Sequence, residues 1–126
     1  KAGQTISYGA THTLTKPTRV ATIAIGYADG YSRLLSNKAR VLVNGQFANI
    51  LGRICMDQCM IDVTNVHNIK VGDEVIIFGD GDVVAEDLAD ALGTINYEIV
   101  CMVSRRIPRI YKKGGETVGK VNYLIN

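Results

Sequence analysis

Four of the six tyrosines in this sequence stand in short frames of small and polar residues. They are Tyr8 in SYGAT, Tyr27 and Tyr31 in GYADGY, and Tyr97 in TINYE. A core tyrosine is normally surrounded by larger apolar side chains, whereas backbone beside glycine can turn sharply or approach a ligand closely. These phenols are therefore candidates for hydrogen bonding to a ligand and for proton transfer.

A further segment, 52–58 (GRICMDQ), concentrates a cation, two sulfur-containing side chains, a carboxylate and an amide. Taken one at a time, such short motifs have high false-positive rates, and each is more simply interpreted as a turn or as a strand with one charge pair. Asp29, in particular, is expected to be a turn aspartate that bonds its own backbone segment. The occurrence of all four segments in one small domain argues against this simpler interpretation for the set as a whole.

The elements that must position these segments are mainly β. Apolar and β-branched runs predict strands over 19–25, 40–43, 46–50, 59–63 and 74–78. Asn44-Gly45, between two of these runs, is the strongest short-range signal for a hairpin. Segment 52–56 is expected to continue as a strand or a turn.

One amphipathic helix is predicted over 84–92, with acidic residues early and Gly93 as its C-terminal stop. Its apolar face consists of Val84, Leu88, Ala91 and Leu92. Thr94 is a candidate cap for a second short helix through 97–102.

The last predicted element is a hairpin of 106–111 with 117–124, joined by the sequence KKGG. Several short strands separated by turn signals are typical of closed β structures, in which strand edges are protected. We therefore predict a mainly β fold: a closed or nearly closed antiparallel β-barrel with one or two short helices.

Composition excludes several functional classes. The 126 residues suit one domain with a sizeable core, and a net charge of +2 gives no support for a nucleic-acid partner. The sequence contains no apolar run of membrane-spanning length and no signal-peptide pattern. Its three cysteines, Cys55, Cys59 and Cys101, have neither zinc-site nor redox-motif spacing. We expect reduced, buried thiols in a cytoplasmic protein, with no metal site and no membrane contact.

The order of the four segments, together with TIAI at 22–25 and RIPR at 106–109, resembles the C-terminal domain of bacterial alanine racemase. That family interconverts L- and D-alanine with pyridoxal 5'-phosphate. The resemblance runs from Ile6 to Tyr111 and implies a linker at 1–5 and a C-terminal β-barrel domain at 6–126. The family's N-terminal barrel, which carries the cofactor lysine, has no counterpart here, and the chain begins at Lys1 without an initiator methionine. We therefore expect a piece of a longer enzyme that is inactive alone.

The resemblance also implies roles for individual residues. Tyr8 matches the tyrosine acid/base, and Met56 matches the residue whose backbone N–H binds the substrate carboxylate. Tyr97 matches the tyrosine that hydrogen-bonds the cofactor phosphate, and Tyr27 matches a tyrosine lining the substrate entry channel. Weaker candidates near the site are Arg53, Asp57 and Arg33.

Partners follow from the same resemblance. The family forms a head-to-tail homodimer, in which Tyr8 and Met56 would serve the partner's cofactor and Tyr97 the cofactor of its own chain. The substrate would be alanine, and D-alanine would supply peptidoglycan precursors. Two alternatives stay open: a serine racemase of the vancomycin-resistance type, and a non-catalytic β-barrel interaction module.

Overall fold

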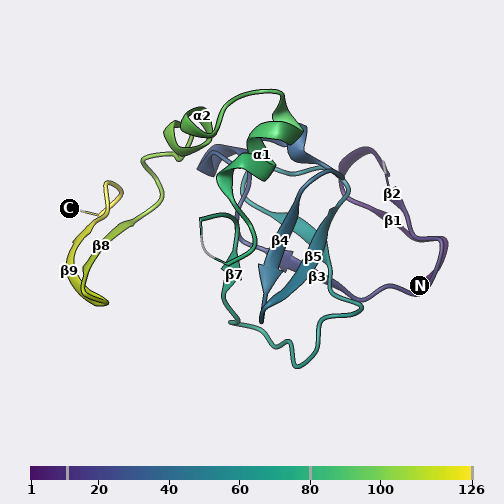
Figure 1. The fold of residues 1–126 in the computed structure, drawn as a ribbon. Helices are drawn as coiled ribbons and strands as arrows, with labels where there is room; N and C mark the ends of the chain where they lie inside the picture. Colours follow the sequence, from purple (N-terminus) through teal and green to yellow (C-terminus); the bar gives the residue numbers. More distant parts are fainter. Residues whose placement is uncertain (11, 80, 126) are drawn as a thin grey trace.

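A curled, five-stranded antiparallel sheet lies at the centre of the computed structural model (Figure 1). Its strands occur in the spatial order β3-β6-β5-β4-β7. Their bounds are β3 Val20–Ile23, β4 Arg40–Val43, β5 Gln46–Leu51, β6 Cys59–Asp62 and β7 Val75–Ile76. The structure describes residues 1–10, 12–79 and 81–125, and for Tyr8 it describes the backbone alone.

Strands β4 and β5 form the hairpin predicted from Asn44-Gly45. Val43 pairs with Gln46, so Asn44 and Gly45 are the two residues of the turn. Both have left-handed backbone, with φ of 50° at Asn44 and 71° at Gly45. This is the geometry of a type I′ turn, whose twist matches that of the flanking strands. The hairpin prediction is confirmed.

The main hydrophobic core joins buried residues of the sheet to Leu88 and Ala89, which belong to the first helix. In β6, Cys59 and Ile61 are fully buried while Met60 and Asp62 are half-buried, as the alternating sequence predicted. Burial of each large aliphatic side chain contributes roughly 1.5–3 kcal/mol to folding. The largest fully buried side chains are Leu35, Ile50, Ile54, Ile61, Val41, Val43, Val63, Val83 and Cys59.

Helix α1 spans Ala85–Leu92 and ends at Gly93, whose φ of 71° confirms the predicted glycine stop. Its buried residues are Leu88 and Ala89. Val84, predicted on the buried face, is instead the extended residue before the helix and is exposed. Ala85, Ala91 and Leu92 are partly buried and pack against the same core.

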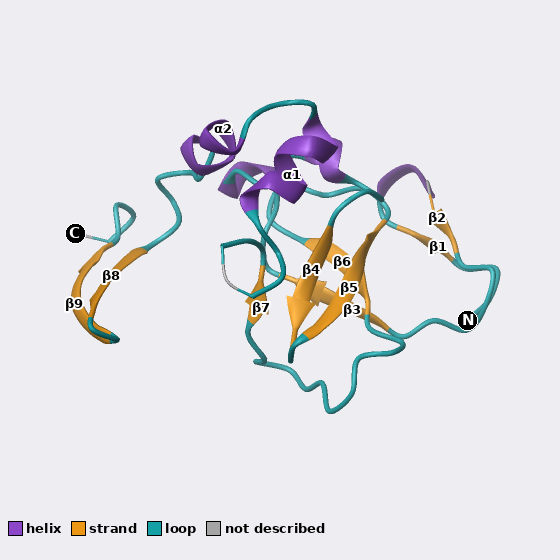
Figure 2. Ribbon diagram, viewed as in Figure 1, coloured by secondary structure: helices purple, strands orange, loops and turns teal. Residues whose placement is uncertain are grey.

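Helix α2 spans Asn96–Cys101 and follows Ile95, so the second short helix is confirmed but the predicted cap is wrong. The Thr94 N–H donates to the Ala89 carbonyl at 3.0 Å, which makes Thr94 part of the end of α1. Its hydroxyl bonds the Glu98 side chain. Figure 2 shows both helices gathered at one end of the sheet.

Two small ribbons lie outside the central sheet. Strand β1 (Thr5–Ile6) pairs with β2 (His12–Thr13), and β8 (Arg109–Lys113) pairs with β9 (Glu116–Val121). The β8–β9 hairpin projects away from the sheet (Figure 1). Its turn is Gly114-Gly115, so the two lysines predicted in the turn belong to the strand.

The fold is mainly β with two short helices, but the predicted closure of the barrel is wrong. The sheet is a curled half-barrel whose edges are β3 and β7. A cavity of about 530 Å³ lies between residues 19–23 and the segment that leads into β7. Strands β1, β2, β8 and β9 pair in the separate ribbons and do not extend the sheet. The sheet therefore has only five strands, which are too few to close a barrel. Among the described residues, no helix has the length and apolar character needed to span a bilayer.

Candidate functional site

The segments GYADGY and GRICMDQ pack backbone against backbone. The Tyr27 N–H donates to the Cys55 carbonyl and the Ala28 N–H to the Met56 carbonyl, each at 3.0 Å. A Cβ placed on Gly26 would lie 2.2 Å from the Cys55 carbonyl oxygen. This approach is closer than any side chain permits, which explains the glycine at position 26.

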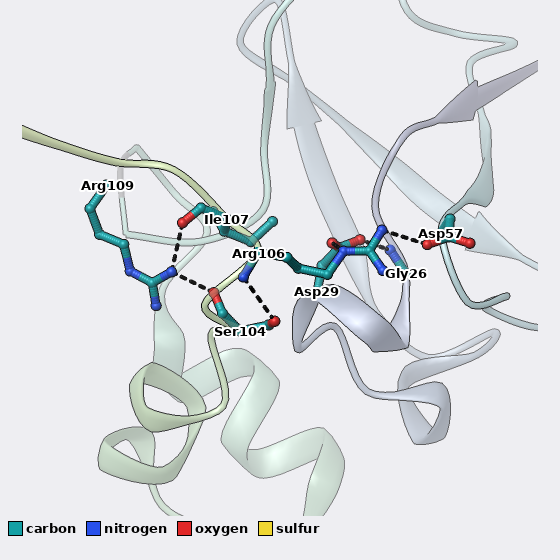
Figure 3. Close-up of polar contacts among 7 residues, drawn as sticks. All are labelled: Gly26, Asp29, Asp57, Ser104, Arg106, Ile107 and Arg109. Atoms are coloured by element: carbon teal, nitrogen blue, oxygen red, sulfur yellow. Dashed lines mark hydrogen bonds and ion pairs between the residues drawn. The ribbon is translucent and has the colours of Figure 1, made fainter. Parts of the chain in front are cut away.

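Asp29 holds the same turn from inside (Figure 3). Only 6% of this residue is exposed. Its Oδ2 accepts from the Gly26 N–H at 2.9 Å, which confirms the prediction of a turn aspartate that bonds its own segment. Its Oδ1 lies 2.9 Å from Nε of Arg106. A buried carboxylate needs such a countercharge because desolvation of a lone ion is costly.

Arg106 also reaches the second loop. Its Nη2 lies 2.5 Å from Oδ1 of Asp57, so one guanidinium joins both segments (Figure 3). The hydrogen bond to Asp57 and the nearby charges of Asp29 and Asp57 raise the pKa of Arg106. The simpler interpretation of GRICMDQ, a strand with one charge pair, would join Asp57 to Arg53. In the structure, Asp57 pairs with Arg106 instead.

A second arginine shapes the loop that carries Arg106. Arg109 donates to the carbonyls of Val103 at 2.8 Å and Ile107 at 2.6 Å, and also to that of Ser104. The Ser104 N–H in turn donates to the Asp29 carbonyl at 3.0 Å. The 103–109 loop is therefore fixed both internally and against the tyrosine turn.

The SYGAT segment lies against the GRICMDQ loop. The Ser7 hydroxyl donates to the Arg53 carbonyl at 2.6 Å. Two non-glycine residues have left-handed backbone here: Ser7, directly before turn η1 (Tyr8–Ala10), with φ of 67°, and Ala10, the last residue of the turn, with φ of 50°. Such backbone costs free energy and concentrates at functional sites. The Tyr8 side chain lies outside the described atoms.

An open cavity of about 840 Å³ lies where these segments meet. Its lining residues are Gly9, Tyr27, Arg33, Arg53, Ile54, Cys55, Met56, Asp57 and Gln58. The structure therefore brings Tyr27, Met56 and the three weaker candidates together, beside the residue that follows Tyr8. Tyr27 is 43% exposed and Met56 is 53% exposed, so both are accessible to a ligand.

Two of the sequence-selected tyrosines lie elsewhere. Tyr97 is in the first turn of α2, is 76% exposed and is not part of the cavity lining. Tyr31 is only 3% exposed, so grouping it with the ligand-facing phenols is wrong. Burial, with a smaller effect of the Cys59 charge, raises its pKa, and its hydroxyl has no hydrogen-bond partner among the described atoms.

The cysteines also differ from one another. Burial, followed by the charge of Cys55, raises the pKa of Cys59 to about 12, which makes it an inert core thiol. Cys55 is half-buried, whereas Cys101 is exposed, which contradicts the expectation that all three are buried.

Sequence reasoning missed Arg106. The stretch RIPR at 106–109 contains it, but nothing in its local pattern reveals that its partners lie in segments 26–31 and 52–58. The need for a cation follows from the burial of Asp29, which only the structure shows.

The comparisons with known proteins agree on one family. The model of the family described as "Alanine racemase, C-terminal domain" matches residues 1–111. The alanine racemase of Clostridium perfringens is 57% identical over 122 residues, which cover 94% of this chain and 32% of the relative. Alanine racemase 1 of Clostridium acetobutylicum is 50% identical over 125 residues, which cover 97% of this chain and 32% of the relative.

Solved structures give the same result. The alanine racemase of Clostridium difficile 630 in complex with cycloserine has a TM-score of 0.94 and 49% identity, and the match covers 99% of this chain and 33% of that chain. The alanine racemase of Bacillus anthracis with bound L-Ala-P has a TM-score of 0.90 and 42% identity, over 98% of this chain and 32% of that chain. The chain thus spans about a third of the length of the relatives it matches.

The close packing at Gly26 leads to a stability prediction. Gly26→Ala should lower the free energy of unfolding of the 126-residue chain by about 1–3 kcal/mol, because the added methyl group would push the two loops apart. Gly119→Ala is the matched control, since its Cβ would make only ordinary contacts, at 3.7 Å from Tyr111. Urea unfolding of both variants measures the difference, and equal stabilities would contradict the packing described.

Proposed function

The chain belongs to the alanine racemase C-terminal domain family, and from this premise we propose that it is one domain of an alanine racemase that interconverts L- and D-alanine. The observation that carries the proposal is the single cavity lined by Gly9, Tyr27 and Met56. These residues come from the three segments to which the resemblance assigns the acid/base, the entry channel and the carboxylate contact. A purely structural module would not explain why these three segments meet at one cavity.

Tyr8 is the proposed acid/base on one face of the substrate. Racemisation removes the α-proton from one face and returns a proton on the other, so a proton-transfer group is needed on each. An ordinary tyrosine has a pKa near 10, and its use near neutral pH requires a stabilising network. The left-handed backbone on both sides of Tyr8 supports a functional role for this residue, because such backbone concentrates at functional sites.

Met56 is the proposed carboxylate-binding residue through its backbone N–H. The Cys55 carbonyl accepts a hydrogen bond from Tyr27. In a trans peptide the carbonyl and the following N–H point in opposite directions, so the Met56 N–H points away from the Tyr27 backbone. This fixed orientation makes the amide a pre-organised donor, which suits an anion. Arg33 and Arg53 line the same cavity and would attract a substrate carboxylate.

Tyr97 is the proposed ligand of the cofactor phosphate. The residues present fit such a group, since the exposed Tyr97 phenol can donate to a phosphate oxygen. Pyridoxal 5'-phosphate, when bound, supplies the electron delocalisation that makes loss of the α-proton feasible. Its covalent lysine would belong to the N-terminal barrel domain, with 1–5 of this chain as the linker and 6–126 as the C-terminal domain.

The remaining proposals concern partners and substrate. The complete enzyme would be a cytoplasmic homodimer that supplies D-alanine for peptidoglycan. The Bacillus anthracis relative was solved with L-Ala-P, and the two Clostridium relatives are named alanine racemases. Both observations favour alanine over serine as the substrate.

The complete enzyme and this chain alone should differ in activity. The full-length protein should racemise alanine, whereas the purified 126-residue chain should show neither racemisation nor the absorbance of a bound pyridoxal group. The reason is that the cofactor lysine is expected in the other domain. A polarimetric assay with equal molar amounts tests this, and turnover by the isolated chain would show that the division of the site between domains is wrong.

Tyr8→Phe in the full-length enzyme should remove the proton-transfer oxygen and little else. Racemisation should fall by about 10²–10⁴-fold, the usual contribution of a general acid or base. Exchange of the α-proton with solvent should survive better from D-alanine than from L-alanine, because the barrel lysine would still act on one face. NMR in deuterated water measures both exchange rates. Equal losses would assign Tyr8 a role in shaping the site.

Tyr97→Phe should weaken cofactor retention instead. A hydrogen bond to a charged group contributes roughly 1.5–3 kcal/mol, which corresponds to about one to two powers of ten in affinity. Both directions of racemisation should fall alike, because the phosphate is remote from both faces of the substrate. Dialysis followed by titration with pyridoxal phosphate measures the affinity. A loss in one direction with unchanged affinity would mean that the roles of Tyr97 and Tyr8 are exchanged.

A further inference from the structure

We infer that Arg106 is a positioning residue for substrate binding: it joins the loop that carries Met56 to the turn that carries Tyr27, and thereby sets the affinity for the substrate carboxylate. The inference rests on the proposed function of Met56. It assigns no direct contact between Arg106 and the substrate.

The contacts place Arg106 at the junction of three segments. Nε lies 2.9 Å from Oδ1 of Asp29, and Nη2 lies 2.5 Å from Oδ1 of Asp57 (Figure 3). The planar guanidinium presents its donors in a fixed fork, so two carboxylates bound to it have a defined separation. The remaining Asp29 oxygen accepts from the Gly26 N–H, which ties the turn to the same group.

Each carboxylate acts next to a residue that would bind substrate. Asp57 directly follows Met56, and Gly26, which donates to Asp29, directly precedes Tyr27. Between these points, the Cys55 carbonyl accepts from the Tyr27 N–H. The orientation of the Met56 N–H is therefore fixed on one side by the Tyr27 turn and on the other by the Asp57 side chain.

The loop that carries Arg106 is itself fixed by hydrogen bonds. The Arg106 N–H donates to the Ser104 hydroxyl at 3.2 Å. The Arg109 guanidinium binds the carbonyls of Val103, Ser104 and Ile107. Because this loop is already ordered, the contacts of Arg106 transmit its position to the cavity without much loss of conformational freedom.

A purely stabilising role is the simpler alternative. Arg106 is 37% exposed and Asp57 is 57% exposed, and ion pairs at such surfaces add little to stability. Asp29, with 6% exposure, is the exception, and its pairing matters for the turn. The ion pair with Asp57 thus has little effect on folding. Asp57 also lines the cavity, so direct loss of its negative charge would lower KM for a carboxylate substrate, whereas loss of positioning would raise it.

The test uses the full-length enzyme and steady-state racemisation in both directions. Arg106→Gln should raise KM about tenfold for L- and D-alanine alike, because the carboxylate is common to both, while kcat changes less. Arg105→Gln is the matched control. It removes the same charge from an exposed neighbour whose guanidinium lies 5.8 Å from the Tyr123 ring centre, and it should leave both parameters unchanged.

Two further variants keep the inference testable if Arg106→Gln folds poorly. Asp57→Asn should raise KM in the same sense, with an unfolding midpoint close to that of the unmodified enzyme. Arg106→Lys should give an intermediate KM, since an ammonium is a point charge that cannot hold both carboxylates in the fork geometry. In the double variant Arg106→Gln with Asp57→Asn, the two KM effects should not multiply.

The outcomes separate the two levels of inference. Alanine racemisation with an unchanged KM in Arg106→Gln and Asp57→Asn would overturn the positioning role and leave the proposed function intact. A fall in kcat or in the unfolding midpoint with KM unaltered would assign Arg106 a structural role only. Absence of alanine racemisation by the unmodified full-length enzyme would overturn the proposed function itself, and this inference with it.

Discussion

The buried carboxylate of Asp29 is the constraint on which the candidate site depends. With 6% exposure, it is the one charged residue among the described residues that is classed as buried. A carboxylate in such a place must be hydrogen-bonded and neutralised, and removal of one partner is costly. Gly26, in the same turn, and Arg106, from a distant part of the chain, meet this need. The turn of Tyr27 and the loop after α2 are therefore brought together by one electrostatic requirement.

Close backbone packing supplies the second requirement of the site. Gly26 lies against the Cys55 and Met56 carbonyls, and a Cβ on Gly30 would lie 2.1 Å from the Met102 carbonyl oxygen. Glycines at these positions let three loops approach without intervening side chains. The loops therefore share backbone hydrogen bonds, from Tyr27 to Cys55, from Ala28 to Met56 and from Ser104 to Asp29. Such bonds can hold a backbone donor in one orientation.

The half-barrel explains why the site lies in loops. Strands β3 to β7 form one continuous sheet, and the connections at one end of it carry the turn of Tyr27 and the loop of Met56. The ribbons β1–β2 and β8–β9 lie outside this sheet and continue directly from the SYGAT segment and from the Arg106 loop. The scaffold is thus rigid where it positions the cavity, and its peripheral ribbons adjoin two of the segments that meet there.

Local sequence alone determined the features that depend on local energetics. The Asn44-Gly45 hairpin, the alternation from Cys59 to Val63, the glycine stop at Gly93 and the mainly β composition all follow from backbone preferences and side-chain periodicity within a few residues. The proximity of Tyr27 and Met56 was expected only through family resemblance. Tertiary structure decided which strands pair, and hence that the barrel is open, because pairing partners are not encoded in a strand's own pattern. It also decided that Tyr31 is a core residue and that Asp57 pairs with Arg106 rather than Arg53. Burial and ion pairing depend on distant segments, and only folding specifies which of these come together.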